Sequence, residues 1–135
     1  MSEEHSLLIK EYAQNPLCNF TMKNYTVKRH EGNFICWDEI TVYLLIEGGI
    51  IKEYSFDGNC STITKAASSF FSELVIGAKI SEVLTWNYET IQKNGFEVSP
   101  RRRRAAVIAL MGCRNAIHEY LKDGKEDVFD DLIDR

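Results

Sequence analysis

The sequence has no long apolar run, and no segment approaches the roughly 18 to 20 apolar residues that a membrane-spanning helix requires. The first residues, Met1-Ser2-Glu3-Glu4, lack the basic and apolar regions of a secretory signal. We therefore expect a cytoplasmic protein that does not enter a membrane.

An excess of positive charge is also missing. The net charge is −4, whereas general binding to nucleic acid requires excess positive charge to displace the counterions of the phosphates. We therefore expect no nucleic-acid partner.

Cysteine is limited to four scattered residues, and no two of them form a CxxC pair: Cys18, Cys36, Cys60 and Cys113. This number and spacing do not suit the disulfide framework of a small secreted protein. The missing CxxC pair gives no support to a zinc ribbon or a thioredoxin-type site. In a reducing compartment the four residues are free thiols, metal ligands or core residues.

The chain does contain enough apolar sequence for one folded domain, which we place at residues 1–135, with a hydrophobic fraction of 44% and a charged fraction of 27%. Periodicity predicts helices over 6–14, 61–76, 81–93 and 100–122, strands over 25–29, 34–46 and 50–56, and a loosely packed acidic tail over 127–134. The fold class predicted is α+β, a small antiparallel sheet of about three strands covered on one face by helices.

The strand over 34–46 has the clearest pattern. Its alternation places Asp38, Ile40 and the apolar residues at every second position after them on one face. A polar turn is predicted at 30–33 before it, and a hairpin turn at Glu47-Gly48-Gly49 after it.

Two cysteines and one carboxylate are candidate metal ligands. Cys36 and Asp38 are two residues apart, so in a strand both side chains project from one face. Cys60 lies between the hairpin and a helix, where free backbone N–H groups are expected to stabilise its thiolate. Such a set suits zinc, iron or a nascent cluster. These residues alone leave a second interpretation open, in which Cys36 and Cys60 are separate half-buried thiols and Asp38 is an ordinary strand-end acid.

The order of motifs resembles the IscU/NifU N-terminal scaffold family of iron–sulfur cluster assembly. That family combines a Cys-Gly-Asp motif, a hairpin ending in Phe, a Gly-Cys loop and a helix of small residues. The corresponding segments here are Asn15-Pro16, Cys36-Trp37-Asp38, Gly49-Ile50-Ile51, Phe56-Asp57-Gly58, Ala66-Ala67-Ser68-Ser69 and Pro100 to Ala105. The resemblance spans nearly the whole chain and implies an IscU-like fold.

The chain departs from the family at its metal ligands. Cys36 and Asp38 are in register, but an ungapped alignment puts Ser61 at the second family cysteine, and Cys60 takes that role only with a one-residue deletion in the loop. Ala105 stands at the third cysteine, after Arg104 at the family's histidine or lysine. Cys113 lies too far along the same helix to replace it, and we predict it to be a core residue.

The resemblance implies an assembly scaffold or sulfur acceptor rather than an enzyme, with a cysteine desulfurase as sulfur donor. A [2Fe–2S] cluster or zinc would be held by Cys36, Asp38 and Cys60, and a homodimer would supply further ligands. A zinc-bound sulfurtransferase of the SufU branch is disfavoured by the missing third cysteine and the missing insertion of that branch. The competing hypothesis is a scaffold fold kept as a metal-free interaction or regulatory module.

Four arginines, Arg101 to Arg104, follow Pro100 at the start of the last helix, where positive charge opposes the helix dipole. We predict this segment to bind a partner, either an acidic protein surface, an anion or Asp38; the alternative is that several arginines point to solvent and meet the acidic tail. The family has here the Leu-Pro-Pro-Val-Lys motif that an Hsp70-type chaperone recognises. Val98-Ser99-Pro100-Arg101-Arg102 departs from that motif, which argues against chaperone binding.

Overall fold

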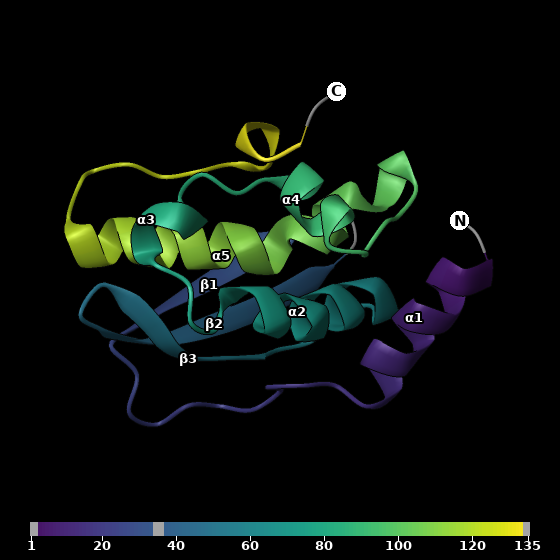
Figure 1. Ribbon diagram of the computed structural model, residues 1–135, viewed down its shortest axis with the longest axis horizontal. Helices are drawn as coiled ribbons and strands as arrows, with labels where there is room; N and C mark the ends of the chain where they lie inside the picture. Colours follow the sequence, from purple (N-terminus) through teal and green to yellow (C-terminus); the bar gives the residue numbers. More distant parts are fainter. Residues whose placement is uncertain (1–2, 34–36, 134–135) are drawn as a thin grey trace.

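The computed structural model describes residues 3–33 and 37–133, with side chains from residue 6 onward in those ranges. The elements in chain order are α1 (Glu3–Gln14), β1 (Val27–Asn33), β2 (Asp38–Glu47), β3 (Ile50–Asp57), α2 (Thr62–Val75), α3 (Ile80–Val83), α4 (Tyr88–Lys93), η1 (Pro100–Arg102), α5 (Arg103–Leu121) and η2 (Phe129–Asp131). The strands form an antiparallel sheet in the order β1-β2-β3. Helices α2 and α5 lie over one face of this sheet, so the predicted α+β fold is confirmed (Figure 1).

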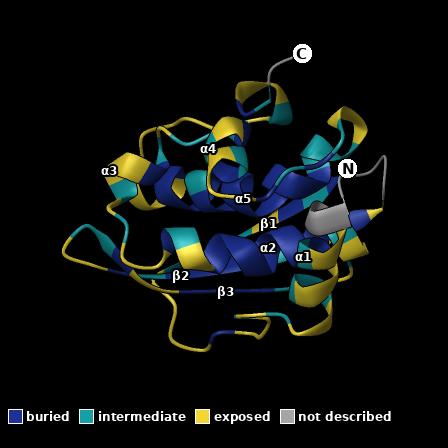
Figure 2. Ribbon diagram, turned by 45° about the vertical axis from the view of Figure 1, so that its right-hand side comes forward, coloured by how far each residue is buried: buried dark blue, intermediate teal, exposed yellow. Residues whose placement is uncertain are grey.

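The core lies between the sheet and these two helices. The inward face of β2 buries Ile40, Val42, Leu44 and Ile46, as the alternation predicts. The buried residues in Figure 2 accordingly gather on α2, α5 and the strands that they cover. Gly48 and Gly49 have positive φ angles of 60° and 74°, which a tight two-residue hairpin turn requires, so the predicted hairpin is confirmed.

The sequence-based boundaries of the first two strands are wrong. Residues 30–33 form no turn, because they are the last four residues of β1 and pair with β2 as far as Asn33 opposite Asp38. The connection between the strands instead includes Trp37, which has a φ of 56° and is 85% exposed. Polar residues within 30–33 resemble a turn locally, but Glu31 and Asn33 face inward and are buried.

Two further predictions need correction. The helix predicted over 81–93 is two short helices, α3 and α4, because the Asn87 side chain caps Thr90 N–H and starts a new helix there. The acidic tail does not pack loosely, since Leu132 is buried and its carbonyl accepts a hydrogen bond from Tyr88 N–H. In the described ranges no helix combines the length and apolar character needed to cross a membrane.

Candidate functional site

Asp38 connects the start of β2 with the start of α2. Its carboxylate is buried and accepts hydrogen bonds from Ser61 N–H, from Ser61 Oγ at 3.2 Å and from Thr64 Oγ1 at 2.6 Å. Ser61 is the N-cap residue of α2, and its hydroxyl in turn accepts from Thr64 N–H. A carboxylate is favourable at this end of a helix because the unpaired N–H groups carry partial positive charge. Asp38 therefore extends the cap of α2 from the neighbouring strand.

Cys60 directly precedes this cap and is half-buried. Its loop is fixed by Gly58, whose φ is 134° and whose α-carbon faces the backbone of Glu39 and Ile40. Glu39 N–H also donates to Asn59 O at 2.9 Å. The structure thus brings Cys60 beside the strand end that carries Asp38, as the hairpin pairing predicts.

The protonation state predicted for Cys60 is wrong. Burial, followed by the negative charge of Asp38, raises the Cys60 pKa to about 11, while Lys65 lowers it by a smaller amount. Two N–H groups at the start of α2 are also not available to the thiolate, because Ser61 N–H donates to Asp38 and Thr64 N–H donates to Ser61 Oγ. At neutral pH the Cys60 side chain is therefore a neutral thiol.

Cys36, the third predicted ligand, lies outside the described residues, and so does its predicted placement on the same strand face as Asp38. The strand partner of Asp38 is Asn33, which sequence reasoning missed. Asn33 is 2% exposed, and neither its Oδ1 nor its Nδ2 has a hydrogen-bond partner among the described residues. The one sequence signal for Asn33 is its position at the end of β1, opposite Asp38 at the start of β2.

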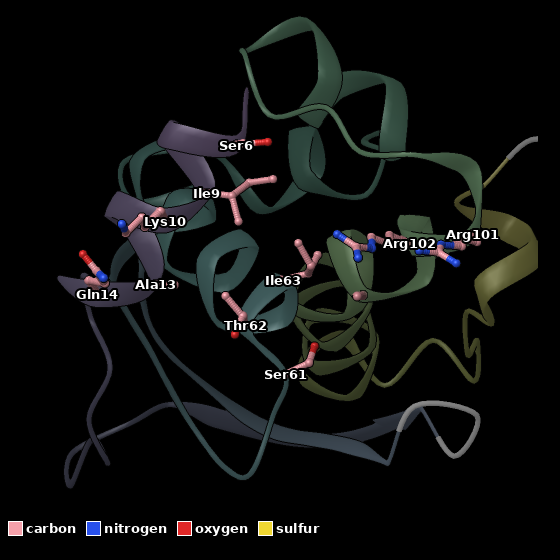
Figure 3. A pocket seen from close by; sticks show the side chains of 11 residues that line it. Ser6, Ile9, Lys10, Ala13, Gln14, Ser61, Thr62, Ile63, Arg101 and Arg102 are labelled. Carbon is pink, nitrogen blue, oxygen red and sulfur yellow. The ribbon is translucent and has the colours of Figure 1, made fainter. Parts of the chain in front are cut away.

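The four arginines divide into two pairs. Arg103 lies over the Tyr88 ring at 4.9 Å and Arg104 lies over the Phe129 ring at 5.1 Å, so these two hold α4 and the tail against α5. Arg101 and Arg102 instead line a cavity of about 750 Å³ between α1, the start of α2 and the start of α5. Ser61 and Ala105 also line it, and Figure 3 shows it from close by.

The family model of the NifU-like N-terminal domain matches residues 7–127. The chain belongs to this family. The iron–sulfur cluster assembly scaffold protein IscU of Thermotoga maritima is 32% identical over 81 residues, which cover 60% of this chain. The chain spans 57% of that relative's length.

Solved structures of the family share the fold. A NifU-like protein (N-terminal) from Brucella abortus superposes with a TM-score of 0.70 at 18% identity, covering 87% of this chain and 94% of that one. A candidate iron–sulfur cluster assembly scaffold protein for the SUF system from Fervidobacterium islandicum superposes with a TM-score of 0.69 at 21% identity, covering 87% of this chain and 96% of that one.

The positions that the resemblance assigns to metal ligands do not form a complete ligand set among the described residues. Ser61, which an ungapped alignment puts at the second cysteine position, is the cap of α2, and Ala105, which it puts at the third, is a buried side chain without a donor atom. Among the described residues no three His, Cys, Asp or Glu side chains lie together as metal ligands would. Structural zinc takes four ligands, as do [2Fe–2S] clusters held by cysteine. One neutral thiol and one carboxylate that already accepts three hydrogen bonds do not fit either group on their own.

A buried polar network on the other half of α5 was also missed. Arg114 makes two hydrogen bonds to Asp127, at 2.8 and 3.1 Å. His118 is buried between two carboxylates, with Nδ1 2.7 Å from Asp123 and Nε2 3.0 Å from Asp127. These contacts fasten the tail to α5.

Cys113 on the same helix is a fully buried core residue, as predicted, and burial raises its pKa.

Proposed function

We propose that this chain works in iron–sulfur cluster assembly as a divergent scaffold or sulfur-acceptor protein, with Cys36, Asp38 and Cys60 as its chemical site. The observation that carries the proposal is the family match over residues 7–127, within which Asp38 and Cys60 meet at the start of α2. The iron–sulfur cluster assembly scaffold that is 32% identical over 81 residues supports the same role. Iron, a nascent cluster or zinc is cargo in this proposal, so we expect no turnover of a small substrate and no enzyme activity.

The two cysteines have different parts in this proposal. The thiolate is the form of cysteine that attacks sulfur, and a pKa of about 11 keeps Cys60 protonated at neutral pH. We therefore assign sulfur acceptance from a cysteine desulfurase to Cys36. Cys60 and Asp38 would be auxiliary donors, and the remaining donors would come from a second chain, either another copy or the sulfur donor itself.

An Hsp70-type chaperone is not part of the proposal. The segment that would be recognised, Val98-Ser99-Pro100-Arg101-Arg102, shares only Pro100 with the family motif, and the backbone of Val98 is already held inside the fold. Val98 is buried, its N–H donates to Tyr88 Oη at 3.0 Å, and its carbonyl accepts from the same hydroxyl at 3.3 Å.

Anaerobic reconstitution with ferrous iron, cysteine and a cysteine desulfurase tests the proposal. Iron and sulfide bound per chain, visible absorption and the mass of a persulfide adduct are measured on the intact protein. We expect Cys36→Ala to abolish the persulfide and Cys60→Ala to reduce bound metal. Cys18→Ser is the matched control, because Cys18 is half-buried like Cys60 but is not one of the proposed donors.

Two results would contradict the proposal. One is the absence of cluster, persulfide and stoichiometric zinc under all these conditions. The other is a Cys36→Ala variant that behaves as the unaltered chain does. A cluster that forms only in a dimer fraction would identify a second copy as the source of the missing donors.

A metal-free interaction module is the second candidate, favoured by Ser61 and Ala105 at the family's ligand positions. Under this hypothesis, protein purified without added metal is folded and contains no iron or zinc by elemental analysis. It also still binds the desulfurase. Replacing Arg101 and Arg102 by Glu together would then abolish binding of the partner. Stoichiometric metal in the purified protein would exclude this candidate.

A further inference from the structure

The cavity beside the altered metal site has the composition of a ligand pocket. Its volume of about 750 Å³ lies in the range of pockets that hold small organic molecules. The apolar part of its lining consists of Ile9, Ala13, Ile63 and Ala105, of which Ile9 and Ala105 are buried. Alanine at position 105 carries no thiol, so this wall offers the cavity an apolar surface.

The polar part of the lining is cationic. Lys10, Arg101 and Arg102 contribute to it, whereas no acidic side chain of the described residues does. None of the three cations makes an ion pair with a described residue, although the chain as a whole has a net charge of −4. Figure 3 shows the Arg102 guanidinium on the side of the cavity toward Ile63, with Arg101 farther out. Arg102 is also half-buried, so an anion that it contacts is partly shielded from water.

The remaining polar lining can donate hydrogen bonds to the same anion. Ser6 and Thr62 present hydroxyl groups from α1 and from the start of α2, whereas the Ser61 hydroxyl already donates to Asp38. Ser61 is engaged by Asp38 on one side of the cavity wall, which fixes its position. Apolar walls, donors and unpaired cations together favour a ligand that has an apolar body and one negative charge.

We propose that this cavity binds a small organic anion with an apolar body, such as a medium-chain monocarboxylate. The carboxylate lies against Arg102, and the hydrocarbon part lies between Ile9 and Ile63. The proposal goes beyond cluster assembly, because it requires none of the four cysteines. It therefore remains testable in a chain whose Cys36 and Cys60 are both replaced by alanine.

Titration of the full chain with octanoate, followed by calorimetry and by isoleucine-methyl NMR, tests the proposal. We expect saturable binding of one octanoate per chain, with methyl shifts at Ile9 and Ile63 and none at the core residue Ile91. Arg102→Gln should weaken octanoate about tenfold, since a hydrogen bond to a charged group is lost. Lys10→Gln changes an exposed residue and should weaken octanoate binding by a smaller factor. This second variant replaces the first in the test if Arg102→Gln folds poorly.

The controls separate charge from apolar contact. Lys52→Gln removes an exposed cation on β3 that is outside the lining, and it should leave octanoate binding unchanged. Octanol and octylamine should bind at least tenfold more weakly than octanoate. The proposal would be overturned if octanol bound as tightly as octanoate, or if octanoate bound the Arg102→Gln variant as tightly as the unaltered chain. Methyl shifts at Ile91 without shifts at Ile9 and Ile63 would also overturn it. Failure of octanoate to bind while an acidic apolar peptide does bind would also overturn it and assign the cavity to a protein partner.

Discussion

Replacing the charged neighbours of Cys60 tests what keeps this thiol protonated. Burial and Asp38 together raise the Cys60 pKa from 9.0 to about 11, while Lys65 acts in the opposite direction. Asp38→Asn removes the negative charge and should lower the pKa, but not to 9.0, because burial remains the larger cause. Lys65→Gln should raise the pKa further. The two variants therefore shift the same titration in opposite directions.

The size of the effect follows from the pKa difference. A shift from 9.0 to about 11 makes the thiolate about a hundredfold scarcer at neutral pH. A more basic thiolate is also a better nucleophile, by about tenfold for two pKa units at a Brønsted slope near 0.5. Alkylation at pH 8 should thus be about tenfold slower than that of an ordinary thiol. The rate should continue to rise with pH beyond 9 and pass its midpoint near 11.

The assay uses a chain with Cys60 as its only reactive thiol, made by replacing Cys18 and Cys36 with serine. The fully buried Cys113 is kept. Iodoacetamide alkylation is followed by mass spectrometry between pH 7 and 11.5. An inflection at or below pH 9 in the chain with Asp38 intact would refute the reasoning, as would an unchanged inflection after Asp38→Asn.

The same shift has a consequence for stability. The folded-state pKa of Cys60 is raised above its unfolded value, so the neutral thiol is the form that the fold favours. The stability that this contributes is fully present below about pH 9 and is lost as the pH rises through about 11. Unfolding by urea across this range should show the loss, and Asp38→Asn should reduce it.

Three further predictions concern the contacts around the site and the tail, each measured by urea unfolding. Thr64→Val removes a buried hydrogen bond to a carboxylate and should lower the free energy of unfolding by about 1.5–3 kcal/mol. The control Thr62→Val changes an exposed residue and should lower it by less than about 0.5 kcal/mol, and equal losses would contradict the capping role. Gly58→Ala places a methyl group against the β2 backbone at a φ of 134° and should cost at least about 2 kcal/mol, whereas Gly124→Ala, with nothing within 4 Å, should cost about 1 kcal/mol. Asp127→Asn leaves a mostly buried guanidinium without its anion and should cost about 3 kcal/mol, and a cost below about 1 kcal/mol would show that the tail is held by other contacts.

Local patterns predicted most of the fold because its strands and long helices bury one face each. The alternation from Ile40 to Ile46 and the Gly48-Gly49 turn determine the hairpin without help from distant residues. The same local reasoning placed a turn at 30–33, where β1 continues. Glu31 pairs with Ile40 in β2, and its buried carboxylate accepts from Asn115 Nδ2 at 2.8 Å; no local pattern reveals a partner so far along the chain.

The candidate site was predictable in position and not in chemistry. Hairpin pairing implies that the loop with Cys60 returns beside Asp38, and the structure confirms this. Whether a thiol at a helix start is ionised depends on its burial, on the charges beside it and on which groups accept from the free N–H groups. Ser61 N–H donates to Asp38, and this depends on side-chain geometry that spacing in the sequence does not give.

The Asp38 carboxylate therefore acts on both the start of α2 and the Cys60 thiol. While Asp38 accepts from Ser61 and Thr64, the first turn is capped, but the Cys60 thiol feels a nearby negative charge that opposes its ionisation. Neutralising or displacing that carboxylate, or opposing it with positive charge from another molecule, would lower the Cys60 pKa, while burial would continue to raise it. Serine at position 61 strengthens the capped arrangement, because its hydroxyl donates to Asp38 and accepts from Thr64 N–H. In this chain the contacts of Asp38 with Ser61 and Thr64 thus contribute to the stability of α2, and a partner that changes the charge around Asp38 would alter both this cap and the ionisation of Cys60.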